Sequence, residues 1–506
     1  MPLVVDFNTI PELFIELEKK YRHTYKTAVA YKPTPDASYV PVTWDQLYED
    51  VMKLGAYFMD KGVKQGDRIA ILSENRYEWY IVDLALQLVG GVNVALYTTL
   101  TASQCEYILN DSEARFLFAS TGIQLKKATQ VFDNCVKLEQ IVAFDYPKNE
   151  ALLKEDQVTL MQDVLALGTE KREAYEEQIF KRAKKVTRDD LATLIYTSGT
   201  TGNPKGAMLT HNNIVTNVKA AHQHIDINHT DIFLSFLPLS HSFERTAGYY
   251  AAIAGGAEVY FAESIDTVAR NMTEVRPTVM MSVPRLFEKI YNLVNKSIEE
   301  GTAVKKKIFS WAIDVGRKYA EGKRGVLVPQ KKLADKLVFD KLKSRTGGRI
   351  RFFVAGGAAL APEIGHFFEA AGLTIMEGYG LTETSPVISC NKYEDVEIGT
   401  VGQVFKGVTV GIQRLQDNKI IAQLSGEDED SNITSQPGEI LVKGPNVMKG
   451  YWNRPQDTEE MIDKNGWLHT GDVGRFVDGK LQITDRIKHL IVNAGGKNIY
   501  PGPIED

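Results

Sequence analysis

The first third of the chain alternates short apolar runs with stretches of helical periodicity. Behind Thr43, which with Gln46 forms a capping box, large apolar side chains recur at helical spacing until Gly62. This spacing predicts an amphipathic helix that ends at the glycine. A predicted strand, helix and strand then follow at residues 69–72, 77–88 and 92–96. Strands joined by a helix are typical of a parallel sheet.

The same alternation recurs further along and then gives way to another pattern. Strand-like runs separated by helix-length segments lie at residues 233–237, 259–261, 279–283 and 352–354. They predict an α/β body that extends to about residue 398. From about residue 399 short apolar runs follow one another closely, and Asp478-Gly479 predicts the turn of a hairpin. A smaller β-rich subdomain is therefore expected at about 399–484.

Composition excludes several classes of protein. A chain of 506 residues exceeds one hydrophobic core, so several domains or subdomains are expected. With 43% hydrophobic residues and a net charge of −6, the chain is predicted to be globular, neither disordered nor nucleic-acid binding. Its three cysteines include no Cys-x-x-Cys pair, which argues against a disulfide framework and a zinc site.

The sequence also predicts neither a signal peptide nor a membrane span. Its first twenty residues carry acids early and lack a basic region ahead of an apolar core. The most apolar long stretch, residues 80–97, is interrupted by polar residues and glycines, whereas a span needs about 20 predominantly apolar residues. We therefore expect a cytoplasmic protein.

Positive charge is concentrated in one segment. Residues 296–351 hold sixteen Lys or Arg against six Asp or Glu. Ile308, Phe309 and Trp311 are among the apolar residues that recur there at helical spacing, which predicts helices. A solvated pair of surface helices explains the pattern, and so does a peripheral contact with an anionic membrane. The sequence also leaves a homodimer open.

The clearest chemical signal is a loop rich in glycine and hydroxyl groups that ends in a lysine. Its candidate phosphate-binding residues are Thr197, Ser198, Gly199, Thr200, Thr201, Gly202 and Lys205. Glycines let backbone N–H groups approach phosphate oxygens, hydroxyls add donors, and Lys205 supplies a positive charge. A Walker A loop would continue with Ser or Thr, whereas Gly206 follows the lysine. The loop therefore predicts a phosphate site of another class, with a polar surface turn as the less favoured alternative.

Two further motifs carry candidate binding groups. Gly378, Tyr379 and Gly380 place an aromatic ring between glycines, which suits stacking on a purine with a close backbone approach. Glu383 in the same motif is a hard oxygen ligand of the kind that Mg²⁺ prefers, and a solvated glutamate is the alternative. Further on, Asp472 is a candidate acceptor for ribose hydroxyls.

Five motifs in this order resemble the adenylate-forming superfamily of acyl-CoA synthetases, luciferases and peptide-synthetase adenylation domains. They lie at residues 196–206, 355–360, 378–384, 467–472 and 485–488. Within the superfamily, residues 236–245, the pattern from Asp472 to Arg486 and the helical segment 296–351 resemble long-chain fatty acyl-CoA synthetases. The resemblance runs from about Thr43 to the last residue.

This resemblance implies a division of the chain. Residues 1–484 would form an N-terminal AMP-binding domain of two α/β subdomains and the smaller β-rich subdomain. Residues 485–506 would hold a hinge, at Asp485 and Lys488, and only the start of a C-terminal lid. Because closure of such a lid completes the family's site, residues 1–506 alone are expected to bind nucleotide but to adenylate poorly.

The resemblance also implies a two-step reaction. A long-chain fatty acid carboxylate would attack the α-phosphate of ATP, giving acyl-AMP and pyrophosphate, and coenzyme A would then displace AMP. Lys205, Thr382 and Glu383 would be the catalytic residues. Thr197 and Glu383 would approach Mg²⁺, and Thr382 would reach the α-phosphate.

The remaining positions that match the family's motifs would bind nucleotide and acyl chain. Adenine would be enclosed by Gly356, Gly357, Ala358 and Tyr379. Asp472 with Arg486 would hold the ribose. The acyl entrance would be lined by His241, and the tunnel walls by Phe243, Gly248, Met281 and Val283.

Several alternatives stay open at this stage. The predicted catalytic residues also suit an aromatic or medium-chain carboxylate. A second alternative, which is not an enzyme, is a non-catalytic binder of nucleotide or fatty acid that lacks its lid. Lysine spacing argues against a P-loop kinase or ATPase. His222, His224 and His229 are read as a solvated helix face in preference to a metal cluster.

Overall fold

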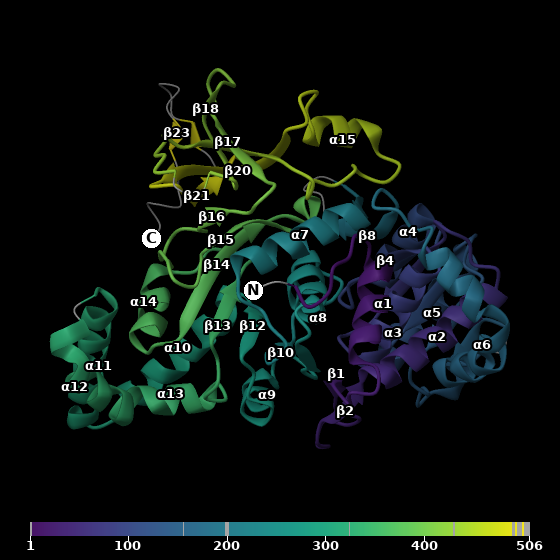
Figure 1. The fold of residues 1–506 in the computed structure, drawn as a ribbon, viewed down its shortest axis with the longest axis horizontal. Coiled ribbons are helices and arrows are strands. Elements are labelled where there is room, and N and C mark those ends of the chain that lie inside the picture. The colour runs from purple at the N-terminus through teal and green to yellow at the C-terminus, as the bar shows by residue number, and fades with distance from the viewer. Residues whose placement is uncertain are drawn as a thin grey trace.

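The computed structural model describes residues 3–154, 156–197, 202–322, 324–428 and 431–487, and two short strands at 491–492 and 498–499. The first part of the chain forms helices and strands on the right of Figure 1, a second sheet with its helices fills the centre and left, and the strands of the last part lie on top. The predicted α/β fold with a smaller C-terminal β region is confirmed.

A seven-stranded, mostly parallel sheet has helices on both faces. Its strands in spatial order are β7 (Val158–Leu160), β6 (Gln140–Ala143), β5 (Phe116–Ala119), β3 (Arg68–Leu72), β4 (Val92–Leu96), β8 (Leu191–Thr197) and β9 (Lys205–Thr210). The covering helices are α2 (Trp44–Asp60), α3 (Tyr77–Leu88), α4 (Ala102–Ser112), α5 (Gly122–Val131) and α6 (Met161–Ala183). Because side chains alternate along a strand, Ile69 lies in the core shared with α2 and α3, and Ala70 in the core shared with α4 and α5.

A nine-stranded sheet forms the centre of the molecule. In spatial order it contains β16 (Gln403–Val404), β15 (Val387–Cys390), β14 (Thr374–Gly380), β13 (Phe352–Ala355), β12 (Val279–Ser282), β10 (Ile232–Ser235), β11 (Glu258–Phe261), β1 (Thr27–Tyr31) and β2 (Val40–Thr43). Its helices include α1 (Ile10–Tyr21), α7 (His211–His224), α8 (Ala251–Ala254), α9 (Val268–Val275) and α14 (Pro362–Ala370). The strands from β14 to β1 are parallel. Ligands bind at the carboxyl ends of such strands.

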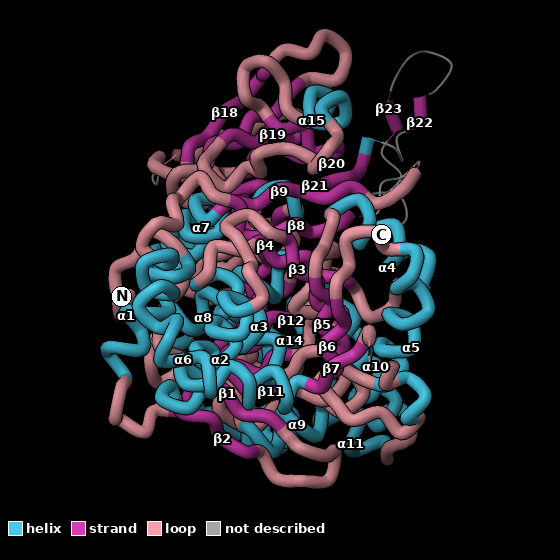
Figure 2. The backbone as a smooth tube through the Cα atoms, turned by 90° about the vertical axis from the view of Figure 1, so that its right-hand side faces the viewer, coloured by secondary structure: helices cyan, strands magenta, loops and turns pink. Residues whose placement is uncertain are grey.

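A five-stranded antiparallel sheet covers one end of this body, as Figure 2 shows from the side. Its strands in spatial order are β18 (Ile420–Ser425), β17 (Thr409–Gln413), β19 (Gly438–Lys443), β20 (Leu468–Val477) and β21 (Lys480–Arg486). The hairpin β20–β21 turns at Asp478 and Gly479, whose φ angles of 46° and 78° suit a left-handed two-residue turn.

The connection between β19 and β20 returns to the first sheet. It contains α15 (Pro455–Met461), and the chain just before this helix runs along the free edge of β9. The N–H of Met208 donates to the carbonyl of Gly450 at 2.9 Å, and the N–H of Trp452 donates to the carbonyl of Gly206 at 2.8 Å. These bonds place residue Tyr451 beside the start of β9.

Two local predictions are corrected. The strand predicted at 233–237 ends at Ser235, and the chain then leaves the sheet. The capping box at Thr43 is only half formed: its hydroxyl accepts from the N–H of Gln46 at 3.2 Å, but the Gln46 side chain donates to Asp50 at 3.0 Å instead. The helix still ends near Gly62, whose φ is 66°.

The basic segment forms more helices than the predicted pair. They are the end of α10 (Pro284–Glu299), α11 (Ala303–Ala320), α12 (Arg324–Ala334), the π-helix η4 (Asp335–Phe339) and α13 (Asp340–Arg345). In Figure 1 they lie at the lower left, away from the five-stranded sheet. Across the described part of the chain, no helix combines the length and apolar character needed to cross a membrane.

Candidate active site

The ends of β8 and β9 bracket the predicted phosphate loop. Thr197, the last residue of β8, is paired with Lys205, the first residue of β9, in the antiparallel ladder. Between them Ser198, Gly199, Thr200 and Thr201 lie outside the described residues. Both Thr197 and Lys205 line a cavity of about 640 Å³, whereas Gly202 does not.

This cavity gathers most of the predicted site residues from distant parts of the chain. Those that line it are Thr197, Lys205, His241, Phe243, Met281, Gly356, Gly357, Gly378, Tyr379, Gly380, Thr382, Glu383 and Arg486. They come from the ends of β8, β12, β13 and β14, the start of β9, the segment before residue 244, the turn after β14 and the five-stranded sheet. Its volume is that of an ordinary ligand pocket, roughly 300–1,000 Å³.

Glu383 presents a buried carboxylate in the short turn after β14. One oxygen, Oε1, accepts from the Tyr451 hydroxyl at 2.7 Å and from the Thr197 hydroxyl at 3.5 Å. The Glu383 carbonyl accepts from the N–H of Met448 at 2.8 Å, which fixes the backbone. A carboxylate and a hydroxyl thus converge at the edge of the phosphate loop, and both are hard oxygen donors that suit Mg²⁺.

Lys205 is held by a carboxylate in this structure. Its ammonium group forms an ion pair with Asp457 of α15 and lies 5.5 Å from the centre of the Tyr451 ring. Both members of the ion pair are about one-third exposed. An incoming phosphate would therefore have to compete with Asp457 for this lysine.

Tyr379, Asp472 and Arg486 form a chain of polar contacts. The Tyr379 hydroxyl donates to Asp472 at 2.7 Å, and the Arg486 guanidinium forms an ion pair with the same carboxylate at 2.8 Å. Burial raises the pKa of Asp472, and the hydrogen bond from Tyr379 and the charge of Arg486 oppose that rise. Asp472 itself does not line the cavity, whereas both of its partners do.

At two glycines a side chain would meet neighbouring atoms. A Cβ on Gly356 would lie 3.3 Å from the Phe243 ring, and one on Gly380 would lie 1.9 Å from the carbonyl oxygen of Pro386. Gly357 has a φ of 83°, which favours glycine. Ala358, predicted beside them, is exposed and does not line the cavity.

His241 faces the cavity with one defined nitrogen. Its Nδ1 accepts from the backbone N–H of Phe243 at 3.1 Å, and burial lowers its pKa. The neutral ring therefore carries its proton on Nε2, which is a hydrogen-bond donor. Such a donor suits a carboxylate.

Part of the cavity lining is made of apolar side chains, and this part is called the apolar branch. They are Ala221, Ile225, Ile227, Ala247, Ala251, Met281, Val354, Cys390 and Phe405. Gly248 and Val283, also predicted as tunnel walls, do not line it. The α-carbon of Gly248 faces the buried Glu244 carboxylate, which a Cβ would approach to 2.6 Å. Val283 is the residue that precedes α10.

Comparison with known proteins places this site in a family. Residues 18–452 match the family described as "AMP-binding enzyme". The chain belongs to the AMP-binding enzyme family. It is 35% identical over 486 residues to long-chain-fatty-acid–CoA ligase FadD15 of Mycobacterium bovis, covering 94% of this chain and 75% of the relative. It is 34% identical to long-chain-fatty-acid–CoA ligase 5 of Rattus norvegicus, covering 93% of this chain and 68% of the relative.

Solved structures of adenylate-forming enzymes share the fold. ATP-bound MatB from Rhodopseudomonas palustris superposes with a TM-score of 0.73 at 23% identity, covering 98% of this chain and 82% of that one. A long-chain-fatty-acid-CoA ligase (FadD1) from Archaeoglobus fulgidus gives 0.69 at 20% identity, covering 96% and 86%. Together with the family match, the relatives identify an adenylate-forming acyl-CoA ligase.

Sequence reasoning missed several residues that line the ligase's cavity. Tyr451 holds Glu383, and the hydroxyl of Ser242 lies 3.3 Å from that of Thr382. Glu439 and His469 form a pair at 3.1 Å, and the hydrogen bond raises the pKa of His469. Tyr451 follows Gly450, whose φ is 136°, and belongs to no helix or strand whose periodicity could mark it in the sequence.

The predicted hinge lies at the edge of the described ligase. Asp485 pairs with Val473 in the β20–β21 ladder, and Lys488 lies outside the described residues.

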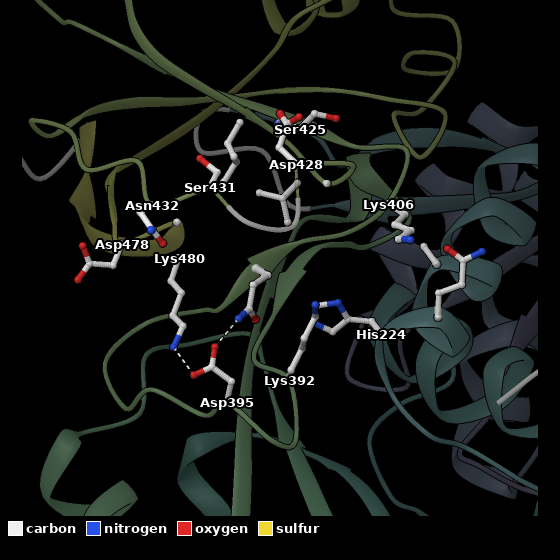
Figure 3. Close-up of a pocket in the computed structure, with 17 residues that line it drawn as sticks. His224, Lys392, Asp395, Lys406, Ser425, Asp428, Ser431, Asn432, Asp478 and Lys480 are labelled. Atoms are coloured by element: carbon white, nitrogen blue, oxygen red, sulfur yellow. Dashed lines mark hydrogen bonds and ion pairs between the residues drawn. The ribbon is translucent and has the colours of Figure 1, made fainter.

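A smaller polar cavity of about 170 Å³ lies where the five-stranded sheet meets α7 (Figure 3). Lys480 donates to Asp395 at 2.7 Å, and so does the side chain of Gln403, at 2.8 Å. His224 at its wall bonds the carbonyl of Cys390 at 2.6 Å. The contact between Lys480 and Asp395 joins the β-rich sheet to the body.

The prediction that the three histidines form a solvated helix face is wrong for His222. That side chain is buried, and its Nε2 lies 2.8 Å from the carbonyl oxygen of Ala251. Among the described residues, no three His, Cys, Asp or Glu side chains gather as metal ligands.

Proposed function

We propose that this ligase activates long-chain fatty acids. The observation that carries the proposal is the apolar branch of the cavity, whose residues include Ala247, Met281 and Val354. Burying one methylene contributes about 0.8 kcal/mol, so each added carbon should raise kcat/KM roughly fourfold until the branch is full. The names of the relatives at 35% and 34% identity point to the same substrate class.

The reaction would proceed in two steps. An oxygen of the fatty acid carboxylate attacks the α-phosphorus of ATP, and the bond from that phosphorus to the pyrophosphate oxygen breaks. The sulfur of coenzyme A, as a thiolate, then attacks the acyl carbon, and AMP leaves. Transfers of this type depend mainly on positioning and charge neutralisation, which this site offers without a protein nucleophile.

We assign the polar residues to these tasks by their positions. Lys205 and the loop before it bind the β- and γ-phosphates, the Thr382 hydroxyl faces the α-phosphate, and the Nε2–H of His241 donates to the substrate carboxylate. Tyr379 and the glycines Gly356, Gly357, Gly378 and Gly380 border the adenine. The ribose hydroxyls are assigned to Asp472 from the motif it belongs to; its partners Tyr379 and Arg486 line the cavity, whereas Asp472 does not.

The oxygen donors at the loop fit a magnesium ion. Glu383 and Thr197 would hold it, since their side-chain oxygens converge at 3.5 Å. Bound there, the ion would neutralise charge on the phosphates and on the leaving pyrophosphate. Tyr451 keeps the Glu383 carboxylate in place by its hydrogen bond.

A chain-length series tests the proposal. With Mg-ATP and the protein at its natural length, AMP and pyrophosphate are expected to form with palmitate. Their formation should decrease as the acid is shortened towards acetate, and acyl-CoA should form only with coenzyme A. In the Met281→Trp variant the larger side chain fills the branch, so the optimum should move to shorter acids. The measurement is kcat/KM for acids of each length.

The control is Met281→Leu, which keeps the volume and should leave the optimum in place. An unchanged optimum in Met281→Trp would contradict the assignment of the branch. AMP formed only with aromatic or medium-chain acids would replace the long-chain proposal by that alternative. Binding of ATP and fatty acid without AMP formation would support a non-catalytic binder.

Asp457→Asn is expected to tighten Mg-ATP binding. The substitution removes the carboxylate that holds Lys205, so the lysine no longer leaves an ion pair to reach phosphate. Exposed pairs contribute about 0.2–1 kcal/mol, which corresponds to an affinity gain of up to roughly fivefold. Isothermal titration with Mg-ATP measures it.

Glu460→Gln is the matched control. It removes the same charge from the same helix, and Glu460 is exposed and forms no ion pair with a described residue. Equal tightening in both variants would reduce the effect to net charge. Weaker binding in Asp457→Asn alone would show that Asp457 assists the nucleotide.

A further inference from the structure

A second, separate cavity lies among the helices of the basic segment. It has a volume of about 530 Å³ and opens between α10, α11, η4, α13 and α14. Its lining residues include Val294, Ile308, Phe309, Val338, Phe339 and Phe367. It shares no lining residue with the cavity of the ligase site.

The interior of this cavity is apolar. Phe339 and Phe367 belong to the buried core, while Val304 and Leu337 at the cavity are 66% and 44% exposed. The π-helix η4 supplies three consecutive lining residues, from Leu337 to Phe339. π-helical turns are rare and are frequent at functional sites. Apolar side chains left open to solvent in a concave surface are typical of a binding site.

The charged residues at the cavity are all cationic. They are Lys305, Lys341 and Arg345, and the described lining contains no acidic side chain. Lys305 donates to the carbonyl and hydroxyl oxygens of Ser297 at 2.7 and 3.2 Å. Lys341 and Arg345 are exposed, and neither forms an ion pair with a described residue. A negative group of a ligand would therefore find two cations that no described carboxylate already holds.

We propose that this cavity is a second binding site for a free fatty acid anion. The alkyl chain lies among the apolar side chains, and the carboxylate contacts Lys341 and Arg345. A concave apolar surface with cations only at its border suits one alkyl chain with one anionic head. The proposal goes beyond the proposed function, because such an anion can bind here whatever carboxylate the ligase activates.

Equilibrium dialysis with radiolabelled oleate, kept below its micelle concentration, counts the sites. The wild-type protein should bind two equivalents. Lys341→Glu/Arg345→Glu should weaken one of them about tenfold or more, since both cations become repulsive. Met281→Trp should remove only the other equivalent. If Met281→Trp removed no equivalent while Lys341→Glu/Arg345→Glu still weakened one, the result would count against the long-chain ligase proposal and leave this site standing.

Two matched variants separate the cavity from general surface charge. Lys306→Glu/Lys307→Glu makes the same charge change on exposed residues of α11 that do not line the cavity, and should leave oleate binding unchanged. Leu337→Glu places a carboxylate in the cavity and should weaken binding. Leu333→Glu, at a similarly exposed residue outside the lining, should not.

A vesicle arm distinguishes the other source of an anionic lipid. Sedimentation with phosphatidylglycerol vesicles that both double variants reduce equally, without saturable oleate binding at the cavity, would overturn the proposal in favour of a membrane contact. A single oleate equivalent that Met281→Trp abolishes would overturn it as well. Equal weakening of oleate binding by the two double variants would do the same.

Discussion

Glu383→Gln is expected to lower kcat by about 10²–10³ and to remove most of the dependence of the rate on Mg²⁺. Glutamine keeps the shape of the side chain and can still accept from the Tyr451 hydroxyl. It lacks the negative charge that a metal ligand needs at this place. Steady-state rates across a magnesium titration, with saturating ATP and palmitate, measure the effect.

The paired control is Glu377→Gln on β14, the strand that precedes the turn with Glu383. Glu377 is also buried and accepts from the backbone N–H groups of Gly399 at 3.2 Å and Leu360 at 3.4 Å, but it does not line the cavity. Its glutamine keeps one acceptor for these bonds, so the magnesium dependence should not change. A Glu383→Gln enzyme within about threefold of the wild-type rate at high Mg²⁺ would refute the metal-ligand assignment.

Tyr451→Phe should show the intermediate behaviour of a positioning residue. Removing its hydroxyl leaves the Glu383 charge in place but takes away the 2.7 Å hydrogen bond that orients it. We therefore expect the KM for Mg²⁺ to rise while kcat at saturating metal stays near the wild-type value. A merely structural role would lower the melting temperature without moving the KM.

Sequence patterns predicted those helices and strands that are marked by the apolar pattern of their own residues. The helix predicted at 77–88 is α3, Tyr77–Leu88, and the run at 92–96 is β4, Val92–Leu96. Strands buried on both faces read as continuous apolar runs, so they are visible without knowledge of their neighbours. The spatial order of the strands has no such local signal, because it follows from contacts across the whole chain.

The candidate site divides in the same way. Glycine-rich and hydroxyl-rich motifs mark Lys205, Tyr379 and Glu383 within a few residues of sequence. Tyr451 and Asp457 reach Lys205 only because their segment is held on the edge of β9, more than two hundred residues away. The burial of His222 likewise depends on packing against the chain at Ala251, which helical periodicity does not reveal.

A buried ion pair joins the two large sheets. Arg245 in η3 (Glu244–Tyr250) and Asp83 in α3 lie 2.5 Å apart, and both are almost fully buried. The Asp83 carboxylate also accepts from Tyr250 at 2.6 Å and from Asn93 at 2.8 Å. Arg245 donates to Thr193 of β8 at 2.6 Å, four residues before Thr197.

This pair therefore connects the cavity lining to the strand that leads to the predicted phosphate loop. Arg245 stands two residues after Phe243, which lines the cavity, and its other partner lies on the strand that leads to the loop. The neighbouring Glu244 is buried too, and burial raises its pKa to about 8. A loss of the ion pair should thus affect both the stability of the fold and the relative position of the two halves of the site.

Asp83→Ala is expected to lower the free energy of unfolding by about 3–5 kcal/mol, because it leaves the Arg245 charge buried without its carboxylate. Asp83→Leu/Arg245→Met, which removes both charges, should lower the free energy of unfolding by less than the sum of the effects of Asp83→Leu and Arg245→Met alone. A double-mutant cycle from denaturant unfolding should give a coupling of about 0.5–3 kcal/mol. Additive effects, or a cost below about 1 kcal/mol for Asp83→Ala, would show that solvent or other groups compensate the charge and that the pair does not hold the two sheets together.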